Sequence, residues 1–148
     1  MAEVDLRRYV ETLLPFDDDL FKSVLRDADE IVIAAVAGGS FTAVVRSPLA
    51  ILESQADRLA LSLAVSQSGY FEGNLPVWMV EAAIQGALGS PTAIEGIPPE
   101  SLVGIYVMSL KEISGRLGDE DLSRFVDSAI DLASEALRAY RQANEATD

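Results

Sequence analysis

The chain has 148 residues, of which 24 are acidic and 11 are basic, giving a net charge of −13 at pH 7. It contains neither histidine nor cysteine, which excludes Ser-His-Asp and Cys-His catalytic arrangements, disulfides and the usual zinc ligand sets. The length predicts one helical domain covering residues 1–148. The acidic balance opposes long-range attraction to nucleic acid and to anionic lipid, although it permits a local basic patch.

The apolar residues make up 49% of the chain, but they are divided into short runs. No uncharged run reaches the roughly 18–20 residues that cross a bilayer as a helix. The N-terminal sequence MAEVDLRRYVETLL carries acids early and lacks the basic and apolar regions of a secretory signal peptide. We therefore expect a soluble, cytoplasmic protein that makes no membrane contact.

Apolar residues recur at helical spacing along most of the chain. Asp17–Asp19 supply an N-cap and first-turn acids, Ser47 and Pro48 have the pattern of an N-cap followed by proline, and Gly118 is placed as a helix stop. We expect a mainly α, compact bundle of five or six helices with one small β-hairpin. The expected helices are 4–14, 17–28, 48–67, 75–88, 99–117 and 119–143.

The second and the last of these helices each have an apolar face. In the second helix the stripe consists of Leu20, Phe21, Val24, Leu25 and Ala28. In the last helix it consists of Leu122, Phe125, Val126, Ala129, Ile130, Ala133, Leu137 and Tyr140.

The stretch EIVIAAVAGGSFTAVVRS, residues 30–47, is the hardest to interpret. It is rich in β-branched residues on both sides of Gly38 and Gly39, and a two-residue glycine turn fits a type I′ hairpin. In that register Val32, Val36 and Phe41 share one apolar face. We predict a hairpin at about 30–46 that lies on the helices.

A helix that ends at the two glycines is the main alternative for this stretch, because the apolar period of the preceding helix continues into it. A phosphate-binding loop is disfavoured, because neither the dinucleotide fingerprint nor the P-loop spacing and lysine is present.

Two expected helices, 75–88 and 99–117, are apolar on nearly every side, the second over residues 101–110. A chain of this length has room for about one fully surrounded helix. The second such helix therefore predicts a partner surface, formed by another copy of the chain or by another subunit. Tyr70, Phe71, Trp78 and Met79 are the candidate partner surface, since aromatic residues are enriched at interfaces. The alternative is that these side chains fill the core.

The acidic triplets at 17–19, 27–29 and 119–121 stand at helix ends, where carboxylates cap the helix, and none fits a calcium loop. We predict no catalytic, cofactor-binding or metal-ligating residue, and no cofactor. The leading hypothesis is a non-enzymatic structural or adaptor subunit that acts through apolar helix faces, as a homo-oligomer or within a larger assembly.

The alternative hypothesis is a small helical subunit of a nucleoprotein complex, comparable in role and size to the small subunits of CRISPR-type effectors. Nucleic acid would then be bound only as part of that complex, through basic residues near the N-terminus. The candidate contacts are Arg7, Arg8, Lys22, Arg26 and Arg46. A third hypothesis, a carboxylate-based hydrolase, needs two buried acids in one cleft.

Overall fold

The computed structural model describes residues 6–14, 16–46, 54–67 and 75–146. In these ranges the chain is mainly helical and contains no β-strand. The helices are α1 (Leu6–Leu13), α2 (Asp18–Asp27), α3 (Glu30–Val45), α4 (Gln55–Ser66), α5 (Val77–Ala87), the 3₁₀ helix η1 (Pro91–Ile94), α6 (Pro99–Ser114), α7 (Asp119–Ser123) and α8 (Val126–Ala146).

The hairpin expected at 30–46 is wrong, because α3 is one continuous helix that passes through Gly38 and Gly39. Each β-branched residue disfavours a helix by only a few tenths of a kcal/mol. A helix satisfies its own backbone hydrogen bonds, whereas the two edges of a lone hairpin would remain unpaired. For a segment that other elements enclose on several sides, a helix therefore leaves fewer backbone groups without a hydrogen bond than a hairpin does.

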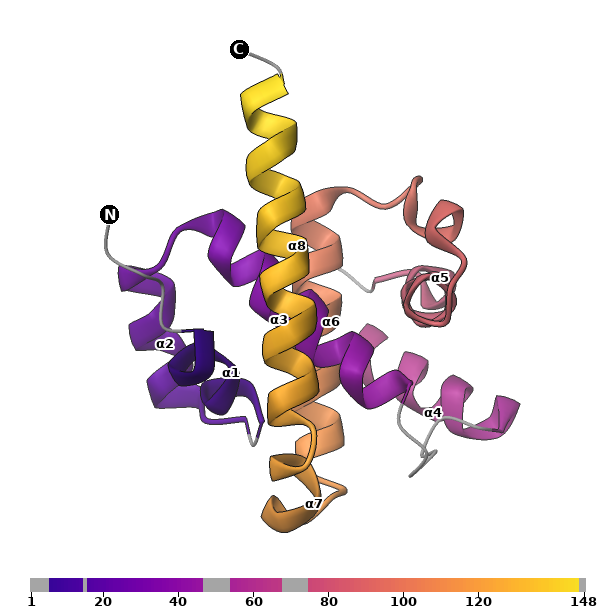
Figure 1. Cartoon of the computed structure of the whole chain (residues 1–148). Coiled ribbons are helices and arrows are strands. Elements are labelled where there is room, and N and C mark those ends of the chain that lie inside the picture. The colour runs from indigo at the N-terminus through magenta and orange to yellow at the C-terminus, as the bar shows by residue number, and fades with distance from the viewer. Residues whose placement is uncertain (1–5, 15, 47–53, 68–74, 147–148) are drawn as a thin grey trace.

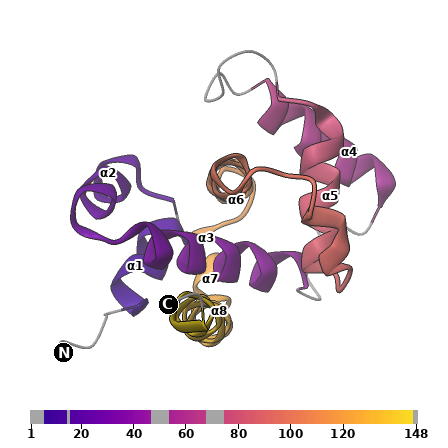
Figure 2. The ribbon, with the colours of Figure 1, turned by 90° about the horizontal axis from the view of Figure 1, so that it is seen from above.

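Helix α3 lies between α6 and α8, which run antiparallel to each other on its two sides (Figures 1 and 2). Its most extensive contact is with α8. A β-carbon added to Gly39 would lie 2.6 Å from the backbone nitrogen of Ala133 and 3.0 Å from the carbonyl oxygen of Ala129. Glycine is needed at this position because the two helix backbones approach too closely for any side chain.

Helix α7 connects α6 to α8, and the other helices form two groups at opposite ends of α3 (Figures 1 and 2). Helices α1 and α2 contact each other near the start of α3, and α4, α5 and η1 pack together near its end. The core extends along α3 and includes Phe41, Leu61, Ile84 and Leu110, all of which are fully buried.

The helix that is enclosed on most sides is α3, and not the two helices that the sequence pattern indicated. Helix α5 leaves Trp78 52% exposed and Leu88 43% exposed. Helix α6 buries Ile105 and Leu110 but leaves Leu102 and Val103 only partly buried. Among the described helices, α3 is therefore the one that its neighbours surround most completely, although the sequence predicts a hairpin for this segment.

Several helix ends differ from the expected ones. Helix α4 begins at Gln55, where the Ser54 Oγ accepts a hydrogen bond from the Asp57 amide at 3.0 Å; the expected start at Ser47 and Pro48 lies outside the described residues. Helix α6 ends at Ser114 with Gly115 as its C-cap, and Gly118 is instead the N-cap of α7. The expected last helix is divided into α7 and α8.

The cap of the second helix is confirmed, since the Asp17 Oδ1 accepts a hydrogen bond from the Leu20 amide at 3.0 Å. Among the helices of the described ranges, none has both the length and the apolar content that crossing a bilayer requires.

Candidate functional site

A cleft of about 380 Å³ lies between α2, the first turns of α3 and α6, and the second half of α8. We call it the α3–α6 cleft. Its volume is within the range of small-molecule sites, which are mostly apolar with a few polar groups at defined positions. Its lining is apolar except for two acids and two tyrosines: Leu25, Ile31, Ile33, Ala34, Pro99, Leu102, Val103, Glu30, Glu100, Tyr106 and Tyr140.

Tyr106 connects this cleft with the core. Its ring packs against Phe41 with centroids 4.9 Å apart, and its Cε2 atom is 3.3 Å from the point where a β-carbon on Gly38 would lie. Burial raises the pKa of Tyr106 to about 12, with a smaller contribution from the nearby Tyr140. The phenol is therefore neutral at physiological pH and keeps its hydrogen-bond donor.

The charged residues that line the α3–α6 cleft are both carboxylates. Glu30 is in the first turn of α3 and Glu100 is in the first turn of α6. Both are exposed, and each carboxylate interacts favourably with the positive end of its own helix dipole. No arginine or lysine lines the cleft, so its net charge is negative.

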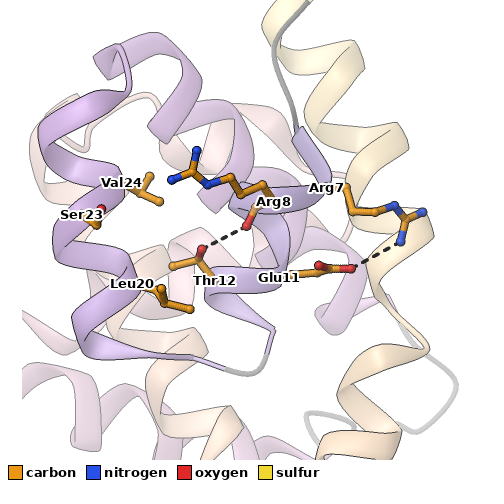
Figure 3. Close-up of a pocket in the computed structure, with 7 residues that line it drawn as sticks. All are labelled: Arg7, Arg8, Glu11, Thr12, Leu20, Ser23 and Val24. Carbon is orange, nitrogen blue, oxygen red and sulfur yellow. Dashed lines mark hydrogen bonds and ion pairs between the residues drawn. The ribbon is translucent and has the colours of Figure 1, made fainter.

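A second cleft, of about 320 Å³, lies between α1 and α2 and contains two of the candidate cations (Figure 3). Arg7 points away from α2, and its Nη2 donates to the Asp127 Oδ1 at 2.7 Å, while its Nη1 is 3.6 Å from Glu11. This hydrogen bond to Asp127 is the main cause of the raised pKa of Arg7. Arg7 therefore pairs with two carboxylates of the protein itself.

Arg8 extends from α1 toward Val24 of α2 (Figure 3), and its guanidinium carbon is 6.0 Å from the centre of the Tyr9 ring. The Thr12 hydroxyl donates to the Arg8 carbonyl at 3.0 Å. This cleft thus contains one cation engaged by carboxylates and one beside an aromatic ring.

The structure does not bring the five candidate nucleic-acid contacts together. Lys22 and Arg26 are four residues apart on α2, and neither lines the second cleft. Arg46 follows the last turn of α3, about 24 Å along the helix from its start, and its Nε donates to the Ala87 carbonyl at 2.6 Å. The basic residues of the N-terminal helices therefore do not form one continuous stripe with Arg46.

Of the candidate partner surface, Tyr70 and Phe71 lie outside the described residues. Trp78 is 52% exposed on α5, and Met79 is partly buried against the core. Helix α4, which packs against α5, exposes two further large apolar side chains, Leu59 and Leu63. We use the name α4–α5 face for the four large apolar side chains that these two neighbouring helices and the C-cap of α5 leave exposed: Leu59, Leu63, Trp78 and Leu88.

The segment that carries the α4–α5 face is poor in charge. Residues 54–98 contain five charged residues in 45 positions, whereas charged residues make up 24% of the whole chain. These five are Asp57, Arg58, Glu72, Glu81 and Glu95. Depletion of charge is the compositional signal that distinguishes the centre of a protein interface from the rest of a surface.

The sequence pattern does not indicate the α3–α6 cleft. It places Leu25 and Tyr140 on apolar stripes, but they are 48% and 44% exposed. An apolar stripe of this width is typical of a helix that faces the core, so it carries no signal of their exposure. The cleft itself depends on where the starts of α3 and α6 meet, which helical periodicity does not indicate.

Within the described ranges, no group of three or more acidic side chains is arranged to hold a metal ion. Comparison of the sequence with protein-family models gives no match, and comparisons with curated proteins and with solved structures give no significant match. The assignment of function therefore depends on the surfaces of this chain.

Proposed function

We propose that the chain is a non-enzymatic interaction subunit that self-associates through the α4–α5 face. The observation that supports this most directly is Trp78, a large aromatic side chain that is 52% exposed on a helix with few charges. Tryptophan is enriched among the residues that contribute most to binding at interfaces. Leu59 and Leu63 add exposed apolar area on the neighbouring helix.

Charge supports a second copy of the chain as the partner. Two molecules of charge −13 repel each other over most of their surfaces. That repulsion is weakest where the charge is sparse, so the α4–α5 face is the surface on which two copies can approach most easily. Association of this kind becomes stronger with added salt, because salt screens the repulsion and leaves apolar contacts in place.

The protein contains one tryptophan, so intrinsic fluorescence reports directly on the proposed interface. Light scattering after size exclusion should show a dimer or higher oligomer at micromolar concentration, with a larger oligomeric fraction in 0.5 M than in 0.05 M NaCl. The emission maximum of Trp78 should shift to shorter wavelength as the protein concentration rises.

Trp78→Glu should give a monomer with an unchanged circular-dichroism spectrum. Tyr140→Glu is the matched control, because Tyr140 is comparably exposed, at 44%, on a helix outside the α4–α5 face; this variant should remain associated. A wild-type protein that stays monomeric at every salt concentration, or an oligomer that survives Trp78→Glu, would overturn the proposal.

A further inference from the structure

We propose that the α3–α6 cleft is a binding site for a small hydrophobic amine, a molecule with an apolar body and one ammonium group. This site is separate from the α4–α5 face: its lining comes from α2, α3, α6 and α8 and includes no residue of α4 or α5. Ligand binding in the cleft is therefore a function beyond self-association, and it does not depend on it.

The size and lining of the cleft determine the body of the ligand. A volume of about 380 Å³ lies at the lower end of the range for small-molecule sites. The side chains of Ile31, Ile33, Leu102 and Val103 form apolar walls from two different helices. An aliphatic or aromatic group placed between them would lose contact with water on both sides, which favours binding in proportion to the apolar area buried.

The charges at the cleft select the polar group of the ligand. Glu30 and Glu100 line the cleft from different helices, and no cation lines it. Within the described part of the chain, neither carboxylate takes part in an ion pair. The two helix dipoles offset part of this negative charge, but the net charge of −13 adds to it. A cation is therefore attracted and a carboxylate is repelled.

The two tyrosines reinforce this preference. The rings of Tyr106 and Tyr140 both line the cleft, and an aromatic face attracts an ammonium group within about 6 Å. The Tyr106 ring also packs against Phe41 on its inner side and lies close to Gly38, which restricts its movement. The cleft thus combines apolar walls, two anions and two aromatic rings, which together match an amine with a hydrophobic body.

Three ligands of one chain length test the proposal: octylamine, 1-octanol and octanoate. With ¹⁵N-labelled full-length protein at pH 7 and low salt, octylamine should shift the amide signals of Ala34 and Val103 and saturate. The octanol affinity should be weaker, and octanoate should be weaker still. Octylamine binding should weaken as salt rises, which is the opposite of the salt effect expected for self-association.

Two kinds of variant separate the contributions of charge and shape. Glu30→Gln combined with Glu100→Gln should reduce octylamine affinity about fivefold, the sum expected for two exposed charge contacts, and should leave octanol unchanged. Glu81→Gln, an exposed acid on α5, is the matched control and should change neither affinity. Ala34→Phe should fill the cleft and abolish binding of both ligands, with thermal unfolding measured to confirm that the variant is folded.

The proposal is overturned if octanoate binds as tightly as octylamine, if the double glutamine variant keeps the wild-type affinity, or if the shifts occur away from the cleft. It is also overturned if none of the three ligands binds. The same titration in Trp78→Glu should give the wild-type affinity, so that a failure of the self-association proposal and a failure of the ligand site give different results.

Discussion

The absent side chain of Gly39 allows α3 to cross α8 at Ala133. A β-carbon on Gly39 would lie 2.6 Å from the Ala133 nitrogen and 2.9 Å from its Cα. These are backbone atoms, which cannot rotate away as the end of a side chain can. Replacing Gly39 with any other residue therefore requires the two helices to move apart.

We expect Gly39→Ala to lower the free energy of unfolding by about 2 kcal/mol or more. Overpacking costs about 1–3 kcal/mol, and a clash with backbone belongs at the upper end. The gain of about 1 kcal/mol in helix propensity offsets part of this cost. Urea unfolding followed by circular dichroism measures the difference.

Gly38→Ala is the matched control for this substitution. Its added β-carbon meets only the edge of the Tyr106 ring, at 3.3 Å, and the helix propensity gain is the same. We expect its stability to lie within about 1 kcal/mol of wild type. Equal stability of the Gly38 and Gly39 variants would show that the crossing of α3 and α8 is not as close as described.

Ser40 and Ser109 have fully buried hydroxyl oxygens without a hydrogen-bond partner among the described residues. Replacing each with alanine removes an unsatisfied polar group and improves helix propensity. We expect each substitution to raise the free energy of unfolding by up to about 1 kcal/mol.

Ser62→Ala provides the comparison, because the buried Ser62 hydroxyl donates to the Arg58 carbonyl at 2.8 Å. The same propensity gain is then opposed by the loss of a hydrogen bond. A Ser40 variant that loses stability relative to the Ser62 variant in urea unfolding would mean that the Ser40 hydroxyl has a partner.

Arg46 connects the end of α3 to the end of α5, since its Nε donates to the Ala87 carbonyl at 2.6 Å. The last carbonyls of a helix lack partners within the helix, and this bond supplies one. Arg46→Met keeps most of the side-chain length and removes the donor, so we expect a loss of about 1 kcal/mol.

Amide hydrogen exchange measured by NMR should show that this loss is local. In the Arg46→Met variant, exchange should become faster than in wild type in the last turn of α5 and stay unchanged in α1. Lys22→Met, an exposed cation on α2, should leave both the stability and the exchange pattern close to wild type. Unchanged exchange in α5 of the Arg46 variant would contradict the role of this bond.

Tyr106 should make the protein sensitive to strong alkali. Its pKa is about 12 in the folded protein, against an ordinary value of 10.0. Because the folded state holds this proton more tightly, the contribution to stability is complete below pH 10 and is lost as pH rises toward 12. Two pKa units correspond to about 3 kcal/mol at most.

Urea unfolding between pH 9 and pH 11.5 should therefore show a steeper loss of stability in wild type than in Tyr106→Phe. Absorbance at 295 nm gives an independent measurement, since one of the four tyrosines should ionise late in wild type and be missing from the variant. Identical pH profiles for the two proteins would contradict the burial of this phenol.

Much of the helical structure could be predicted from the sequence. The acids at Asp17–Asp19 identify the start of α2, and apolar spacing locates α1, α5 and α6 to within a few residues. The helix expected at 119–143 is divided into α7 and α8. These signals are local, because caps and periodicity depend on residues only a few positions apart. Helix α4 begins at Gln55, and the start expected at Ser47 and Pro48 lies outside the described residues.

The candidate site could be predicted only in part. Trp78 was recognised as a surface candidate, and the structure leaves it exposed. The α3–α6 cleft was not predicted, because Glu30 and Glu100 are 70 positions apart in the sequence and line one cleft only through the packing of α3 and α6.

By itself, the sequence determined that this acidic chain forms several helices, because helix caps and apolar periodicity depend on residues only a few positions apart. Only the tertiary structure decided the state of residues 30–45, where Gly38 and Gly39 fit a turn as well as a helix. The local preferences of this stretch differ by tenths of a kcal/mol per residue, whereas burying Val36 and Phe41 against the helices that α3 contacts contributes several kcal/mol. Packing is the larger effect, and it makes α3 the central helix of the protein.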